Sequence, residues 1–315
     1  MAARQFSALR LSMNSLLLAL ALLASGTALA ASSHCGKEGV WIEILGAGTT
    51  ALDGQAASSF LIWEDNAPRM LVDVGDGSKQ GFEKSGATLN GIEVIALTQV
   101  QIDHAGDLGA YLIASAESER AAPLTILGPD SNQSPLPSTS EFMQRLIGAN
   151  GLYPQYADAL TSRSSPGNRL RIADVPATGS RRWARYASDS LRLAAIPVNH
   201  GDIPALAWRV EIGGKTIVFS GDFNNVKNAV GKFAKDADAL VVSHVIPEIS
   251  RGALREKFAL PSQLGRVAAQ ANARMMILAS RSERTRGRES LSRQAIEQSY
   301  DGPLLFANDG ECWGL

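Results

Sequence analysis

Histidine and aspartate residues that could ligate a metal ion recur at the ends of expected strands. Asp103 and His104 are adjacent and follow an expected strand over residues 91–97, and His200 and Asp222 follow later strands. Loops at strand ends are where a scaffold can direct several side chains to one point. Imidazole and carboxylate groups suit zinc and other divalent metals. Residue type alone leaves open a second interpretation, in which these are surface groups or hydrogen-bonded core groups.

The elements that must position these residues are mostly short strands, with helices between some of them. Apolar runs predict strands over residues 40–45, 58–63, 70–74, 91–97, 124–127, 191–196, 205–212, 215–219, 239–242, 275–278 and 304–307. Helical spacing predicts helices over residues 105–118, 141–147, 261–273 and 294–300. Residues 130–168 read as an insertion. The pattern is typical of an α+β fold in which two sheets pack together with helices outside.

Composition excludes several classes of protein. The chain has 315 residues, of which 45% are hydrophobic, 30 are basic and 31 are acidic. This balance argues against disorder and against general binding to nucleic acid, which needs a basic surplus. The sequence contains no Gly-x-Ser-x-Gly elbow, phosphate-binding loop or Cys-x-x-Cys pair. Serine-hydrolase, nucleotide-hydrolase and thiol-redox chemistry therefore have no support.

The first thirty residues are expected to be a cleaved secretory signal. Arg4 and Arg10 precede a run of leucine and alanine, and the segment ends in Ala28-Leu29-Ala30, a small-residue cleavage site. A transmembrane anchor is disfavoured because the apolar run is short for a bilayer. Cleavage leaves a single domain of residues 31–315, which we expect in the periplasm or outside the cell, with no membrane contact.

Two cysteines, Cys35 and Cys312, lie at the two ends of this expected domain. In an oxidising compartment they could form a disulfide that closes nearly the whole domain into one loop. Two independent thiols are the alternative.

Six short motifs are spread along the chain. They are Leu45-Gly46-Ala47-Gly48, Leu71–Gly77, Thr98–His104, Pro197–His200, Phe219–Asp222 and Leu278–Arg284. In this order they resemble the metallo-β-lactamase superfamily, particularly its ribonuclease Z-like and related exported hydrolase branches. The resemblance covers nearly all of residues 31–315. It implies an αββα four-layer sandwich and the hydrolysis of an ester or phosphodiester by a metal-activated water.

The resemblance implies seven metal ligands, and four of them are kept: Asp103, His104, His200 and Asp222. Histidines of the family are replaced at three positions: Gln99, Gln101 and Ser280. An amide oxygen is a poor zinc donor beside imidazole. We therefore expect at most one divalent metal, zinc or else manganese or iron, held by Asp103, His104 and Asp222, with His200 as a weak ligand.

The resemblance also implies roles around the metal. Asp103 would serve as base as well as ligand, and His244 is a candidate general acid. A histidine packed at a strand end is the alternative for His244. Substrate contacts are expected from five polar residues: Gln99, Gln101, Ser280, Arg281 and Arg284.

Two functions follow from this pattern. One is a single-metal hydrolase acting on a small anionic or ester substrate. The other is a catalytically inactive relative whose old pocket binds a small anion or a protein. A tRNA substrate is disfavoured, because loss of Arg4 and Arg10 leaves 28 basic and 31 acidic residues, a net charge of −3, on an exported chain.

Overall fold

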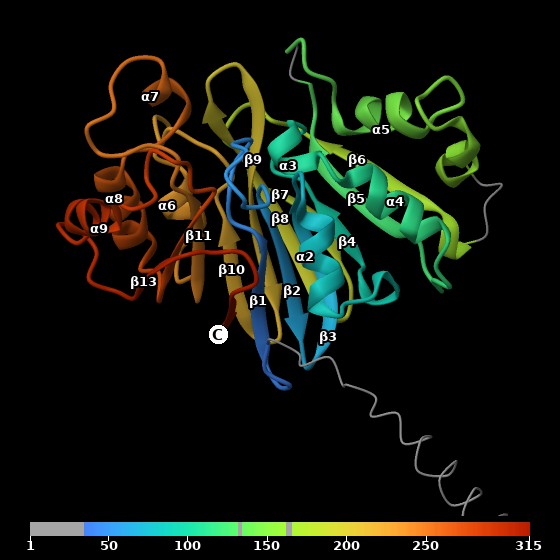
Figure 1. Ribbon diagram of the computed structural model, residues 1–315, viewed down its shortest axis with the longest axis horizontal. Coiled ribbons are helices and arrows are strands. Elements are labelled where there is room, and N and C mark those ends of the chain that lie inside the picture. The colour runs from blue at the N-terminus through green and yellow to red at the C-terminus, as the bar shows by residue number, and fades with distance from the viewer. Residues whose placement is uncertain (1–34, 132–133, 162–165) are drawn as a thin grey trace, which may run out of the picture. The chain divides into compact units, whose positions relative to one another are not determined.

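The computed structural model of this chain describes residues 35–131, 134–161 and 166–315. The expected signal segment, residues 1–30, lies outside these ranges. Within the unit Ser33–Leu315, two seven-stranded β-sheets pack face to face and helices cover their outer faces (Figure 1). The αββα sandwich expected from the sequence is confirmed.

The first sheet has the strand order β14-β1-β2-β3-β4-β5-β6. Its strands are β1 Val40–Gly46, β2 Ser59–Glu64, β3 Ala67–Val74, β4 Val94–Ala96, β5 Leu124–Pro129, β6 Leu170–Val175 and β14 Cys312–Gly314. β1 to β3 form an antiparallel meander, and β3 to β6 run parallel. The helical elements of this half are α2 Ser78–Ser85, η1 Leu89–Gly91, α3 Ile102–Ala105, α4 Leu108–Ala116, α5 Thr139–Ile147, η2 Pro154–Leu160 and η3 Pro166–Asn168.

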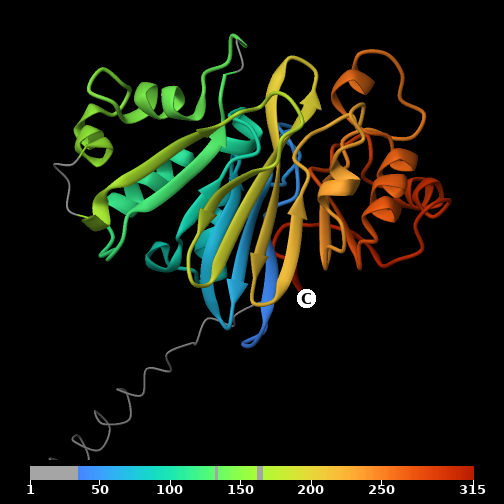
Figure 2. The same ribbon diagram turned by 180° about the vertical axis from the view of Figure 1, so that it is seen from behind.

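The second sheet has the order β13-β12-β11-β10-β9-β8-β7, and the view from behind brings it to the front (Figure 2). Its strands are β7 Trp183–Ala187, β8 Leu191–His200, β9 Ile203–Ile212, β10 Lys215–Phe219, β11 Ala239–Ser243, β12 Met276–Ala279 and β13 Leu304–Phe306. Its helices are α6 Val230–Phe233, α7 Leu254–Lys257, α8 Pro261–Ala271 and α9 Glu289–Ile296. None of the helices in the described part of the chain has the length and apolar character of a membrane span.

Three apolar clusters hold the four layers together. The central cluster lies between the sheets, where the Phe60 and Phe219 rings are 5.1 Å apart. A second cluster joins the outer face of the second sheet to α8 through residues such as Leu240 and Leu264. A third joins the first sheet to its helices around Tyr111. Each sheet is therefore buried on both faces, which explains why most strands read as continuous apolar runs.

The residues expected as an insertion, 130–168, form in their described part the connection between β5 and β6. These strands are parallel neighbours, so the chain must cross back over the sheet, and α5 does so. The sequence did not predict α2, β6, β7 or β14, and it placed the last helix at 294–300 where the structure has α9 at Glu289–Ile296.

A disulfide joins the two ends of the domain. Cys35 and Cys312 are bonded, with their Cα atoms 5.4 Å apart, as the sequence suggested. Cys312 lies on β14, which pairs antiparallel with β1 and places Cys312 opposite Glu43. The bond therefore fastens the C-terminal edge strand to the start of the fold.

Candidate metal centre

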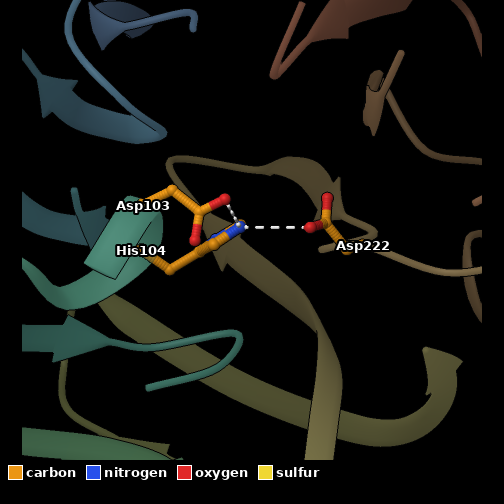
Figure 3. A group of neighbouring side chains, drawn as sticks. All are labelled: Asp103, His104 and Asp222. Carbon is orange, nitrogen blue, oxygen red and sulfur yellow. Dashed lines mark ion pairs between the residues drawn. The ribbon is translucent and has the colours of Figure 1, made fainter. Parts of the chain in front are cut away.

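Three of the predicted ligands meet where the two sheets present their strand ends. Asp103 and His104 lie on α3, just after β4, and Asp222 lies in the loop after β10 (Figure 3). One donor atom from each residue lies within 4.8 Å of the other two. The Nε2 atom of His104 is 3.4 Å from Asp222 Oδ2 and 3.9 Å from Asp103 Oδ2. The fold thus brings together residues more than one hundred positions apart in the chain.

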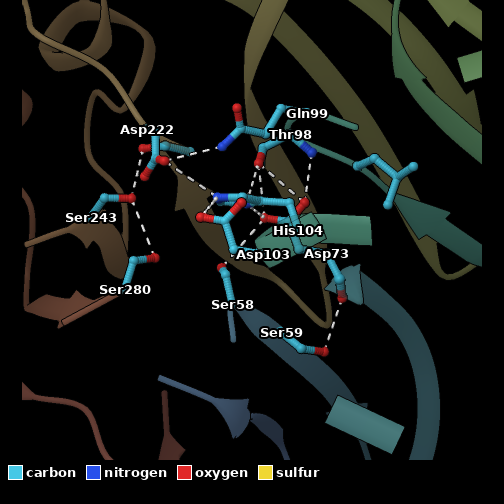
Figure 4. Close-up of polar contacts among 12 residues, drawn as sticks. Ser58, Ser59, Asp73, Thr98, Gln99, Asp103, His104, Asp222, Ser243 and Ser280 are labelled. Carbon is cyan, nitrogen blue, oxygen red and sulfur yellow. Dashed lines mark hydrogen bonds and ion pairs between the residues drawn. The ribbon is translucent and has the colours of Figure 1, made fainter. Parts of the chain in front are cut away.

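Asp73 and Thr98 hold the imidazole of His104 in place from behind (Figure 4). His104 Nδ1 is 2.8 Å from Asp73 Oδ2, and the Thr98 backbone N–H donates to Asp73 Oδ1 at 2.7 Å. An ionised carboxylate only accepts, so Nδ1 carries the donated proton and Nε2 faces Asp222. No role for Asp73 was predicted from the sequence. The available signal was its position in Leu71–Gly77, at the end of β3.

His200 presents its ring to the same carboxylate. Its Nδ1 donates to the backbone carbonyl of Lys257 at 2.9 Å, and its Nε2 is 3.7 Å from Asp222 Oδ2. A carbonyl only accepts, which fixes the proton on Nδ1. His200 lies outside the group of three donors, yet its Nε2 is directed at Asp222.

The ionisation of these groups is strongly coupled to their surroundings. Burial opposes protonation of His104, but the carboxylates of Asp73, Asp103 and Asp222 outweigh it and raise its pKa well above 6.5. Burial favours the neutral form of Asp222, but His104 and His200 hold its pKa below the ordinary value. For Asp103 burial has the larger effect, and the pKa is raised. A cation that takes Nε2 of His104 must therefore displace a proton.

The donor set fits one divalent cation. It consists of two carboxylates and an imidazole whose second nitrogen is anchored, which is a suitable combination for a transition metal. Among the described residues, none donates a hydrogen bond to the buried Asp222 Oδ1, so one acceptor of the group is open to a cation.

Gln99 and Ser280 are placed differently from the sequence expectation. Gln99 is fully buried and its Nε2 donates to Asp222 Oδ2 at 3.0 Å, so it positions this carboxylate, and its contact with substrate stays a prediction. Ser280 is 4% exposed, and its Oγ lies 3.5 Å from Ser243 Oγ. It lines a cavity of about 10 Å³, close to the space that one water needs. Gln101 is half-buried at the start of α3, and its contact with substrate stays a prediction.

Arg281 is not available to bind substrate. Its guanidinium donates to the Ala307 carbonyl at 3.2 Å, pairs with Glu289 and lies over the Phe306 ring, and the residue is 4% exposed. These contacts fasten the chain after β12 to the C-terminal segment. The expected role of Arg281 was therefore wrong, because a basic run in the sequence does not show which members turn inward. Arg284 is exposed, and its role stays a prediction.

His244 lies on the far side of β11 from the metal centre. The Ser243 hydroxyl faces the centre, where it donates to the Gly221 carbonyl, so the next side chain points to the opposite face of the strand. His244 Nε2 is 2.8 Å from Ser292 Oγ on α9. The expected general-acid role of His244 is inconsistent with this position, and the alternative of a packed histidine describes it.

Replacing His244 with glutamine should change stability but not catalysis. Burial chiefly, with Arg281 adding to it, lowers the pKa of His244 to about 4, so the folded protein keeps the ring neutral. As the pH falls below 6.5, the unfolded chain protonates this histidine while the folded protein keeps it neutral until about pH 4. The free energy of unfolding should therefore fall by about 3 kcal/mol over this range. Urea unfolding at pH 7 and at pH 4.5 should show a smaller acid loss in His244→Gln than in the wild type. Unchanged metal content with a hydrolysis rate reduced by about tenfold or more would instead support the general acid.

Comparison with known proteins agrees with this geometry. A model of the beta-lactamase superfamily domain matches residues 69–279. Ribonuclease Z of Mycobacterium bovis (strain BCG / Pasteur 1173P2) is 28% identical over 204 residues, 64% of this chain and 68% of that protein. The structure of the short form of human tRNase Z has a TM-score of 0.65 at 17% identity, and covers 87% of this chain and 98% of its own. The structure of the metallo-beta-lactamase fold protein YhfI from Bacillus subtilis has a TM-score of 0.63 at 16% identity, and also covers 87% of this chain and 98% of its own. The chain therefore belongs to the metallo-β-lactamase superfamily, a family of hydrolases.

Proposed function

We propose that this protein is an exported hydrolase that uses one divalent metal ion to cleave an ester or a phosphodiester. The observation that carries the proposal is the convergence of Asp103, His104 and Asp222, whose donor atoms lie within 4.8 Å of one another. The anchoring of His104 by Asp73 supports it, because metal-binding histidines commonly donate their other N–H to a carboxylate. Export is supported by the disulfide, since such bonds persist in oxidising compartments.

Each residue has a distinct task in this proposal. A divalent ion would supply Lewis acidity toward the oxygen atoms of water and substrate. Asp222 is held for it by Gln99, and His104 by Asp73. Asp103 has a side chain that is 19% exposed, against 1% for His104 and 5% for Asp222. Asp103 is therefore the carboxylate that a water can reach, and it can accept the proton of that water.

A second function, binding of a small anion without catalysis, is favoured by Gln99. Its amide gives Asp222 Oδ2 a neutral hydrogen-bond donor at a position where the resemblance implies a metal-ligating histidine. When His104 is protonated, its Nε2 carries a proton and gives the carboxylates of Asp103 and Asp222 a cationic partner without a metal ion. This alternative differs from the first in its lack of turnover.

The experiment that separates the two uses the purified chain lacking residues 1–30. The protein is loaded with zinc, manganese or iron and assayed with bis(p-nitrophenyl) phosphate and p-nitrophenyl acetate. We expect hydrolysis that a chelator removes and added metal restores. Metal-loaded protein that hydrolyses neither compound would favour the binding function, and hydrolysis unaffected by chelation would contradict a metal-dependent reaction.

Replacing Asp73 with asparagine should weaken metal binding by about 10- to 100-fold. The new amide can donate toward His104 Nδ1, which moves the ring proton to Nε2 and blocks the ligating atom. Competition with a metal-sensitive dye measures the dissociation constant. Asp174→Asn serves as control, because that carboxylate binds Ser140 in the connection between β5 and β6. An affinity equal to that of the wild type would show that Asp73 does not orient the ligand.

A further inference from the structure

The segment 251–258, which contains α7, packs against the end of β8 beside the candidate metal centre (Figure 1). The Lys257 carbonyl accepts from His200 Nδ1 at 2.9 Å, and the Phe258 ring stands edge-on to the His200 ring with centroids 5.1 Å apart. The Glu256 carbonyl accepts from the Asn224 amide. None of the residues of α7 is buried. The Lys257 and Glu256 carbonyls and the Phe258 ring thus hold this segment beside the centre.

The side chain of Lys257 lies along the tip of the β8–β9 hairpin. An ideal Cβ atom placed on Gly201 would be 3.4 Å from Lys257 Cγ and 3.6 Å from Lys257 Cε. Gly201, next to His200, has a φ of +68°, so the tip presents no side chain and leaves room for the lysine stem. Lys257 therefore runs beside a predicted metal ligand, at the same end of the sandwich as Asp103 and Asp222.

Lys257 is half-buried, so its side chain is partly open to solvent. Within the described ranges, no carboxylate lies within 4.0 Å of its ammonium, although Glu256 precedes it in the chain and Asp202 follows Gly201 at the hairpin tip. Arg251 and Arg255 on the same segment are exposed, so its cations outnumber its one acid. A flexible lysine is a suitable point charge for a phosphate oxygen, whereas a neutral carboxylic ester offers it no charge.

We propose that Lys257 is a substrate-positioning residue whose ammonium binds the anionic oxygen of a phosphodiester and so favours phosphodiesters over neutral esters at this centre. The inference rests on the proposed function. It assigns a specificity role to the side chain of a residue whose main-chain carbonyl accepts from His200, so a side-chain substitution keeps that hydrogen bond.

The test compares Lys257→Gln and Lys257→Arg with the wild type in metal-loaded protein. We expect Lys257→Gln to raise both the KM for bis(p-nitrophenyl) phosphate and the dissociation constant of inorganic phosphate by about tenfold. Turnover of p-nitrophenyl acetate should not change, and Lys257→Arg should keep most of the phosphate affinity because it keeps the charge. Lys37→Gln is the matched control, since Lys37 is exposed and precedes β1, at the opposite end of the sandwich.

Three outcomes overturn the inference. The first is unchanged phosphate binding and an unchanged KM in Lys257→Gln. The second is an equal loss of activity toward both esters, which would mean that the substitution disturbs His200. The third is a wild-type protein that binds no phosphate. Phosphate binding that depends on Lys257, in a protein that cleaves neither ester, would support the inference and contradict the proposed hydrolysis. Cleavage of both esters with no effect of Lys257→Gln would contradict the inference alone.

Discussion

Asp222→Asn should remove the metal ion and lower hydrolysis by at least about 100-fold. Asp222 is the residue toward which the other groups are directed: its Oδ2 lies 3.0 Å from Gln99 Nε2, 3.4 Å from His104 Nε2 and 3.7 Å from His200 Nε2. Its charge is needed to hold a cation in a buried position, since a neutral amide does not offset the desolvation of the ion. Metal analysis and the phosphodiester assay measure the two effects.

The fold should survive this substitution. The amide oxygen of the replacement still accepts from Gln99, so the loop after β10 keeps a hydrogen bond. Thermal unfolding of the variant checks this. Asp301→Asn, at an exposed position after α9, is the matched control and should keep both metal and activity. Retention of metal by Asp222→Asn would show that the ligand set is wrong.

Replacing both Cys35 and Cys312 with serine should lower the free energy of unfolding by about 5 kcal/mol. The bond joins residues separated by 277 positions, so it removes a large part of the conformational freedom of the unfolded chain. It also holds β14, a strand of three residues, against β1. Urea unfolding of the variant under non-reducing conditions measures the loss.

A reducing agent provides the control for this prediction. It should destabilise the wild type by a similar amount and leave the serine variant unchanged. A loss below about 1 kcal/mol would mean that β14 and the packing of the termini hold the ends without the bond.

The part of the site that the sequence predicted is the part encoded by short motifs. Asp103, His104 and Asp222 stand in segments of fixed spacing, and the structure brings their donor atoms together. Asp73 was overlooked because an aspartate at a strand end, two positions before a glycine, is typical of a turn, whereas here it accepts from Thr98 and His104.

The remaining errors concern the direction of side chains. The strand predicted over residues 239–242 extends to Ser243 in the structure. Because side chains alternate along a strand, this one-residue difference bears on which face His244 occupies. The burial of Arg281 depends on Glu289 and Phe306, which only the tertiary fold brings near. Lys257 lies in no recognisable sequence motif. Its place beside the centre depends on the hydrogen bond from His200, 57 positions away, to its backbone carbonyl.

The strands that the sequence missed are those at the edges of the sheets. β6, β7 and β14 pair on one side only, and their charged or short sequences lack the apolar run of a central strand. The central strands were predicted because burial on both faces demands continuous apolar residues. The central strands could therefore be predicted from the sequence, whereas three of the four edge strands could not.

The proposed metal centre is tested most directly by the metal content of the purified chain lacking residues 1–30. Growth medium is supplemented with zinc, manganese and iron, and the protein is analysed by elemental mass spectrometry after removal of loosely bound ions. We predict about one equivalent of divalent metal per chain, held by Asp103, His104 and Asp222. A content below about one tenth of an equivalent under all three supplements would contradict it.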